Sequence, residues 1–158
     1  MHGHADWSAA RASEIIAAEK GREGPLLPIL HGLMDAFGYV PEPAVPMVAE
    51  ALNLSRADVH GVVSFYHDFR DAKPGRHVVK LCRAEACQAV GARGLERHAT
   101  ATLGVRFGET TADGAITLEP VYCLGNCAAG PSMMVDGEPV GRVDAAAFDA
   151  TVAALRTP

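Results

Sequence analysis

Apolar residues in the first half of the chain recur at the three-to-four-residue spacing of amphipathic helices. The segment Ser8 to Lys20 is rich in helix formers, begins at a serine N-cap candidate and stops at Gly21. The apolar stripe of a second segment opens after Pro25 and ends at Gly38. We therefore predict two helices, each with one face directed to a core.

Two further helices are predicted before residue 68. Pro43 can open the third, which Asn53 closes, and Ser55 with Asp58 forms a capping-box start for the fourth. The apolar stripe of the fourth helix is Val59, Val62, Val63 and Tyr66. Residues 8–68 are thus expected to form a bundle of three or four short helices.

The hydrophobic period changes after the segment Asp71 to Gly75, whose composition is that of a linker. His77 to Leu81 is a short β-branched run, and Ile116 to Tyr122 resembles a strand, although Pro120 weakens that assignment. Between them, Ala89 to Leu103 has helical periodicity. Its apolar stripe is Val90, Leu95, Ala99 and Leu103. The pattern predicts a βαβ unit with parallel strands.

The last part of the chain predicts a hairpin and a helix. Ser132 to Val143 turns at Asp136-Gly137, a dipeptide suited to a two-residue turn, and Asp144 can cap the final helix. The order βα, β, ββ, α is that of a thioredoxin-like domain. The expected fold class is therefore α+β, with a small helical bundle over residues 1–73 and a thioredoxin-like α/β domain over residues 74–158.

Charge and hydropathy exclude several classes of partner. The 158 residues carry a net charge of −5, and lysine and arginine are scattered without a basic run, which argues against nucleic acid and anionic membrane surfaces. No segment approaches the roughly 18 apolar residues of a spanning helix, and Met1 to Trp7 lacks the features of a signal peptide. We expect a cytoplasmic protein without direct membrane contact.

Four cysteines are the candidate chemistry. All of them lie between Cys82 and Cys127, and in a reducing compartment such clustering indicates a site rather than a disulfide framework. Four residues separate Cys82 from Cys87, and three separate Cys123 from Cys127. Each pair follows a predicted strand, so parallel strands would bring both pairs to one end of the sheet.

The spacing favours an iron-sulfur cluster but leaves zinc open. Structural zinc sites use gaps of two to four residues, and these gaps lie at the wide end of that range. Wider loops suit a [2Fe-2S] core, in which each iron takes two thiolates. Gly125 and Gly130 let the backbone approach closely and turn N–H groups toward sulfur, or they serve ordinary turns, while Pro131 fixes the exit of the loop.

Other chemistries fit less well. A thioredoxin-type dithiol needs two cysteines two residues apart, and a Rieske centre needs two histidine ligands, neither of which these loops contain. A helix-turn-helix reader would use Ser55 to Tyr66, which carries only Arg56 as a fixed positive charge. No catalytic motif is present, so we expect cofactor ligands and no substrate site in this chain.

The cysteine motifs are similar to those of a known family. Cys82-x4-Cys87 and the run from Cys123 to Pro131, preceded by Gly38-Tyr-Val-Pro41 and the run from Val59 to Tyr66, resemble the thioredoxin-like [2Fe-2S] subunit of NADH dehydrogenases (the complex I family). Within that family, the residues of Cys82 to Gln88 and of Asn126 to Met134 look most like the gamma subunit of soluble, molybdenum-containing, NAD-dependent formate dehydrogenases.

The resemblance implies that Cys82, Cys87, Cys123 and Cys127 bind one [2Fe-2S] cluster and that the chain is a non-catalytic electron-transfer subunit. It further implies two partners: an iron-sulfur subunit that binds FMN and NAD, against which the helical part packs, and a larger catalytic subunit with the molybdenum cofactor. The equivalent subunit of complex I or of an NAD-linked hydrogenase diaphorase, and a zinc-stabilised interaction module, are the alternatives.

Overall fold

The structure is a computed structural model that describes residues 5–157. The first four residues of the N-terminal segment, for which we expect no signal peptide, lie outside this range. Within it the chain divides into two compact units, with the break between Lys73 and Pro74. No helix in residues 5–157 is long and apolar enough to cross a membrane.

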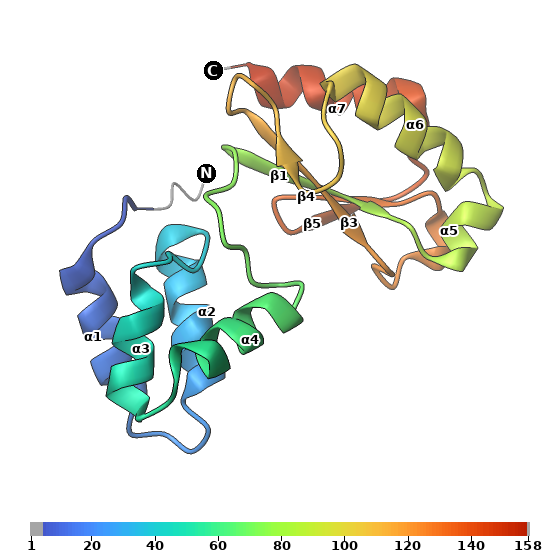
Figure 1. Ribbon diagram of the computed structural model, residues 1–158. Coiled ribbons are helices and arrows are strands. Elements are labelled where there is room, and N and C mark those ends of the chain that lie inside the picture. The colour runs from blue at the N-terminus through green and yellow to red at the C-terminus, as the bar shows by residue number, and fades with distance from the viewer. Residues whose placement is uncertain (1–4, 158) are drawn as a thin grey trace. The chain divides into compact units, whose positions relative to one another are not determined.

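The first unit consists of helices in its described part. They are α1 (Ala9–Glu19), α2 (Leu26–Phe37), α3 (Ala44–Leu52) and α4 (Arg56–Phe65), as Figure 1 shows. The Ser8 hydroxyl accepts the N–H of Arg11 at the start of α1. Gly38 and Asn53 adopt the left-handed conformation that ends α2 and α3. The four predicted helices and their stop signals are confirmed.

Helix α4 has the predicted capping box but a shorter apolar stripe than expected. The Ser55 hydroxyl accepts the N–H of Asp58, whose carboxylate accepts the N–H of Ser55. Val59 and Val63 are buried, whereas Tyr66 is 43% exposed. The helix ends at Phe65, and the extended backbone of Tyr66 takes its side chain off the predicted face. The assignment of Tyr66 to the core stripe was wrong for that reason.

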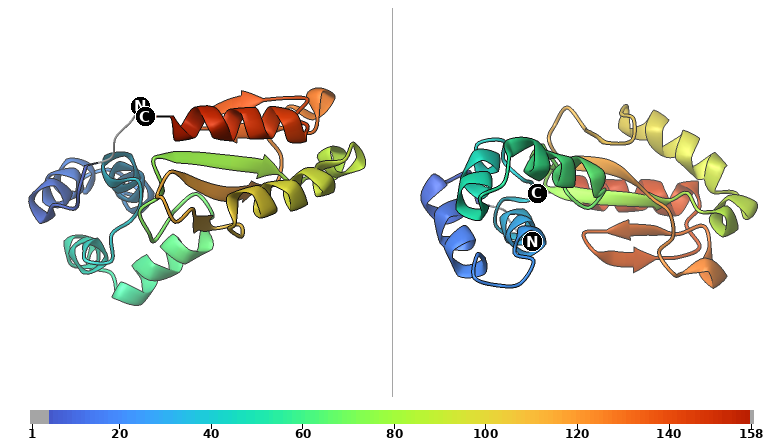
Figure 2. Two further views of the ribbon diagram at one scale, coloured as in Figure 1. Left: turned by 90° about the horizontal axis from the view of Figure 1, so that it is seen from above. Right: turned by 60° about the horizontal axis from the view of Figure 1, so that its bottom comes forward.

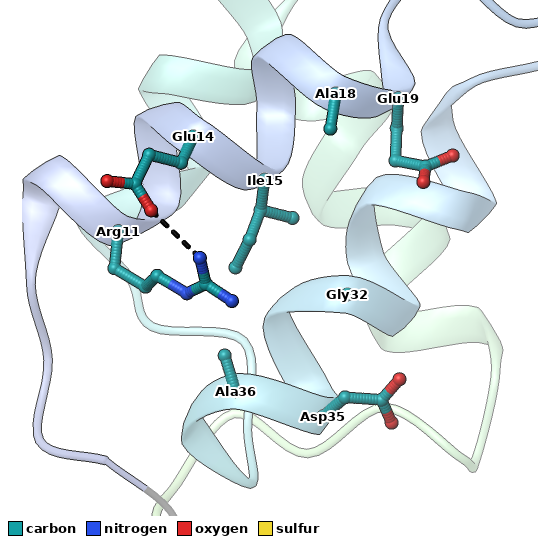
Figure 3. Close-up of a pocket in the computed structure, with 8 residues that line it drawn as sticks. All are labelled: Arg11, Glu14, Ile15, Ala18, Glu19, Gly32, Asp35 and Ala36. Atoms are coloured by element: carbon teal, nitrogen blue, oxygen red, sulfur yellow. Dashed lines mark hydrogen bonds and ion pairs between the residues drawn. The ribbon is translucent and has the colours of Figure 1, made fainter.

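Close helix packing in the first unit depends on one glycine. A Cβ atom at Gly32 of α2 would lie 2.7 Å from the Ile15 Cγ2 atom of α1, so only glycine leaves room for this contact (Figure 3). A hollow of about 390 Å³ lies beside it. On the rim of this hollow, Glu14 pairs with Arg11 at 2.8 Å and Glu19 with Arg22 at 2.7 Å.

The second unit contains a five-stranded mixed sheet of order β2-β3-β1-β4-β5 among its described residues. The strands are β1 (His77–Cys82), β2 (Glu109–Thr110), β3 (Ile116–Val121), β4 (Met133–Val135) and β5 (Glu138–Val140). β1 and β3 are parallel, and the predicted hairpin joins β4 and β5. The sequence did not predict β2, which has only two residues.

Pro120 is tolerated in β3 because it faces an unpaired edge. The carbonyl of Val121 accepts the N–H of Arg83 at the end of β1, so Val121 is directed to β1 and Pro120 to the opposite side. On that side, β2 pairs only with Thr117 and Leu118. The N–H that proline lacks would therefore have had no ladder partner.

Three helices complete the second unit: α5 (Glu85–Ala89), α6 (Ala92–Leu103) and α7 (Ala145–Arg156). α6 and α7 lie side by side on one face of the sheet, and their apolar residues share its core (Figures 1 and 2). The predicted single helix from Ala89 was wrong in its start. Gly91 has a φ of 105°, which separates α5 from α6, and Val90 lies between them and is 55% exposed. The predicted α+β fold class is confirmed.

Candidate metal centre

The parallel pairing of β1 and β3 brings both cysteine loops to one end of the sheet, as the sequence predicted. Cys82 is the last residue of β1, and Cys123 follows β3 by two residues. Cys87 lies in α5, and Cys127 begins a 3-10 turn (Cys127–Ala129). The local folds differ because one loop continues into a helix and the other into irregular backbone.

The two pairs differ in exposure. Cys82 and Cys87 are 3% and 1% exposed, whereas Cys123 and Cys127 are exposed, and none of the four forms a disulfide. The Sγ atoms of Cys123 and Cys127 are 3.8 Å apart. A tetrahedral metal with bonds of about 2.3 Å to sulfur separates two sulfur ligands by about 3.8 Å, so this pair fits one metal centre.

The four sulfur atoms form two pairs rather than one tight group. Within residues 5–157, no three His, Cys, Asp or Glu side chains converge closely enough to hold a single metal ion. Cys82 and Cys87 lie in one buried cluster with Ala92, and the sulfurs of Cys123 and Cys127 form the second pair. This donor set suits a two-metal core with two thiolates on each metal better than one zinc ion.

The environment of two thiols, those of Cys87 and Cys127, raises their pKa and so favours the protonated form. Burial raises the pKa of the Cys87 thiol, and a hydrogen bond with Cys82 raises it further, while the backbone N–H of Ser132 acts in the opposite direction. The hydrogen bond with Cys123 raises the pKa of Cys127, and the charge of Cys123 adds to that effect. A bound metal needs thiolates, so metal binding at this site would release protons.

The first cysteine loop is fixed by hydrogen bonds around Gln88. The Gln88 side chain donates from Nε2 to the carbonyl of Arg83 at 2.8 Å, and its Oε1 accepts from Arg93 Nε at 2.6 Å. The Arg83 guanidinium lies 4.9 Å from the centre of the Phe107 ring and its Nε 3.2 Å from Glu96 Oε1. The positive charge next to Cys82 is therefore held in one place.

The second cysteine loop has unusual backbone geometry. Cys123 has a φ of 138°, a conformation that side-chain-bearing residues rarely adopt. Gly125, with a φ of 74°, donates its N–H to Cys123 Sγ at 3.3 Å, as predicted. The N–H of Gly130 donates instead to the Cys127 carbonyl, so that part of the prediction was wrong. Gly130 provides space, because a Cβ there would lie 3.0 Å from Val90 Cγ2 and 3.4 Å from Cys87 Sγ.

Two residues at the second loop were missed by the sequence analysis. Ser132 is 1% exposed, and its hydroxyl donates to the carbonyls of Asn126 and Ala129. At Gly141, a Cβ would lie 2.8 Å from both the Ala129 carbonyl oxygen and the Asn126 Nδ2 atom. The available signals were a small polar residue after Pro131 and a glycine after the hairpin, both of which are ordinary turn features.

The comparisons with known proteins agree with this geometry. Residues 12–156 match the family model of the thioredoxin-like [2Fe-2S] ferredoxins. The chain is 39% identical over 106 residues to a subunit of the NADH-quinone oxidoreductase of Pseudomonas aeruginosa, covering 67% of this chain and 64% of that one. It is 37% identical over 135 residues to a subunit of an NADH-quinone oxidoreductase of Rhizobium meliloti, covering 85% of this chain and 80% of that one.

A solved structure has the same fold. The crystal structure of an NAD+-reducing [NiFe]-hydrogenase in the air-oxidized state superposes with a TM-score of 0.71 at 25% identity, covering 84% of this chain and 23% of the longer hydrogenase chain. The predicted thioredoxin-like class and [2Fe-2S] cofactor are those of the matching family. From the match over residues 12–156 and the two cysteine pairs, the chain belongs to the thioredoxin-like [2Fe-2S] ferredoxin family.

Proposed function

We propose that Cys82, Cys87, Cys123 and Cys127 hold one [2Fe-2S] cluster and that the chain transfers single electrons within an NAD-linked oxidoreductase complex. The supporting observation is the position of the two cysteine pairs at the carboxyl ends of adjacent parallel strands. The 3.8 Å separation of the Cys123 and Cys127 sulfurs supports the same ligand set, since it suits two ligands of one tetrahedral iron.

The residues around the site have defined tasks in this proposal. Bound there, the cluster would accept and release one electron at a time. The buried Cys82 and Cys87 would anchor it to the second unit, and the exposed Cys123 and Cys127 would be its outward side. The N–H of Gly125, which donates to Cys123, and the backbone of Ser132, which acts to lower the pKa of Cys87, would stabilise negative charge on sulfur. Residues 74–158 would be the cluster domain.

The proposed partner is an iron-sulfur subunit that binds FMN and NAD, against which the helices of residues 1–73 would pack. The relatives from NADH-quinone oxidoreductases and the NAD+-reducing hydrogenase support an NAD-linked complex. The loop residues 82–88 and 126–134 resemble those of the gamma subunit of formate dehydrogenases, and this resemblance implies a larger molybdenum-containing catalytic subunit. We propose a cytoplasmic location, with which four free cysteines agree.

Electron paramagnetic resonance of the anaerobically purified chain, reduced with dithionite, tests the cofactor. Iron and zinc are quantified on the same sample. We expect two irons per chain and a rhombic or axial one-electron signal. A sample that gives no signal and contains one zinc per chain would replace the electron-transfer function with that of a zinc-stabilised module.

Purification of the native complex through a tag on this chain tests the partners. We expect a flavin- and NAD-binding subunit and a molybdenum protein to copurify, and formate to reduce NAD. Reduction of NAD by hydrogen, or oxidation of NADH by quinone, would assign the chain to a hydrogenase or to complex I instead. A Cys87→Ala chain is the control, because it should lose the cluster and keep the helices that are proposed to bind the partner.

A further inference from the structure

Ser132 has hydrogen bonds to both cysteine loops. Its backbone carbonyl bonds the first loop, and its side-chain hydroxyl bonds the second. It immediately precedes β4 and is 1% exposed, although it is polar. A buried hydroxyl in a folded chain needs a partner, since burying it without one costs free energy. The partners of Ser132 lie on both cysteine loops.

The backbone of Ser132 binds the start of the first loop. Its carbonyl accepts the N–H of Cys82 at 3.0 Å. The same backbone acts to lower the pKa of the Cys87 thiol, against the larger effect of burial. Cys82 is therefore held in relation to a residue of a different segment.

The side chain of Ser132 binds the second loop. The hydroxyl Oγ lies 3.2 Å from the Asn126 carbonyl oxygen and 3.3 Å from that of Ala129, and donates its single proton between them. These two carbonyls flank Cys127. Through this hydroxyl, the position of Cys127 is tied to the residue whose carbonyl binds Cys82 of the buried pair.

We infer that Ser132 is a positioning residue that sets the separation between the two cysteine pairs. The inference rests on the proposed four-cysteine [2Fe-2S] site. Hydrogen bonding and the geometry of the protein around a cluster affect both its stability and its reduction potential. A change confined to the Ser132 hydroxyl would leave all four thiols and the hydrogen bond from Cys82 to the Ser132 carbonyl in place while freeing the second loop.

Ser132→Ala should fold, because neither carbonyl is left without a donor. The Asn126 carbonyl also accepts the N–H of Ala129, and the Ala129 carbonyl also accepts the N–H of Arg142. The lost hydroxyl should therefore act mainly on the position of Cys127. One hydrogen bond contributes enough to change an equilibrium or rate about fivefold.

The experiment compares Ser132→Ala with Thr117→Val in the purified full chain. Thr117 is the matched control, since it is another buried hydroxyl of the same sheet, and its Oγ1 bonds the Gly75 N–H and Thr110 Oγ1 rather than a cysteine loop. We expect Ser132→Ala to lose iron to a chelator about fivefold faster and to show an altered visible circular dichroism spectrum. Thr117→Val should keep the wild-type spectrum and rate, even if its unfolding midpoint falls.

A third variant, Ser132→Thr, keeps the hydroxyl and should restore the wild-type rate to within about twofold. Equal rates and spectra for wild type and Ser132→Ala, or a Ser132→Thr variant that is as fast as Ser132→Ala, would overturn the inference. Failure of Ser132→Ala to fold, with Ser132→Thr and Thr117→Val both folded, would also overturn the inference, because the hydroxyl would then be needed by the whole fold and not only by the second loop. A wild-type chain without iron would instead refute the proposed function on which the inference rests.

Discussion

The two cysteine loops occupy the same end of one sheet, yet they are built differently. In the first loop, Cys82 ends a strand and Cys87 lies in a helix, and both sulfurs are buried beside Ala92. In the second loop, Cys123 and Cys127 are exposed on irregular backbone with positive φ at Cys123 and Gly125. The first loop is part of a small core, and the second is held in place by hydrogen bonds and close contacts.

This difference separates two requirements of a redox site. A buried pair of ligands fixes the cofactor to the fold, and an exposed pair gives it an outward side for electron exchange. Cysteine can supply both the buried and the exposed ligands, because the helices, strands and loops around each cysteine determine how exposed its side chain is. The following predictions test this division, in order of decreasing effect.

The largest effect is expected when a ligand is removed from the buried pair. Cys87→Ala should abolish cluster binding and also lower the free energy of unfolding of the apo chain by about 1 kcal/mol, because it leaves a small cavity. Cys123→Ala should abolish cluster binding while leaving the stability of the apo chain unchanged, since that side chain is exposed. Iron content and urea unfolding measure the two effects. Equal stability losses in both variants would contradict the division.

Thiol modification compares the pairs directly in the metal-free chain. Cys123 and Cys127 should react with a maleimide on the order of 100-fold faster than Cys82 and Cys87, because buried thiols react only after local opening. Mass spectrometry of peptides at short labelling times identifies the modified residues. The unfolded chain in urea is the control, in which all four should react at similar rates.

Gly141→Ala should disturb the second loop alone. Its Cβ would meet the Ala129 carbonyl oxygen and the Asn126 side chain at 2.8 Å, and such overpacking costs about 1–3 kcal/mol. Iron retention should fall with stability. Gly94→Ala is the matched control, because Gly94 lies in α6 with open space around it, and alanine there should stabilise the helix. Unchanged iron retention in Gly141→Ala would show that the close contact does not position the loop.

The smallest effect is expected far from both loops in the sequence, at the capping box of α4. The hydrogen bonds from Ser55 hold the pKa of Asp58 below its usual value of 3.8. The Asp58 carboxylate therefore stabilises the folded chain fully at pH values well above 3.8. This contribution is lost as the pH falls through the pKa that Asp58 has in the folded chain. Thermal unfolding of wild type and Asp58→Asn should differ slightly at about pH 6, and the difference should shrink as the pH falls below 3.8. A constant difference would exclude a charge effect.

Local signals predicted the helical unit well. Ser8, Gly38, Asn53 and the Ser55 capping box each act on residues within one turn, so the sequence window that contains them also contains their partners. One failure lies where a distant partner decides, because strand β2 exists only through pairing with β3. The other is local, because the positive φ of Gly91 divides the helix expected from Ala89.

The sequence by itself determined the α+β class, the two cysteine pairs and their position after parallel strands, because hydrophobic period and residue spacing are local properties. Only the tertiary structure decided which pair is buried, and only it revealed Ser132 and Gly141 at the second loop. Burial and hydrogen-bond partners depend on segments that are distant in sequence. The local sequence around a serine or glycine that follows a turn does not identify the residues it will contact in the folded chain.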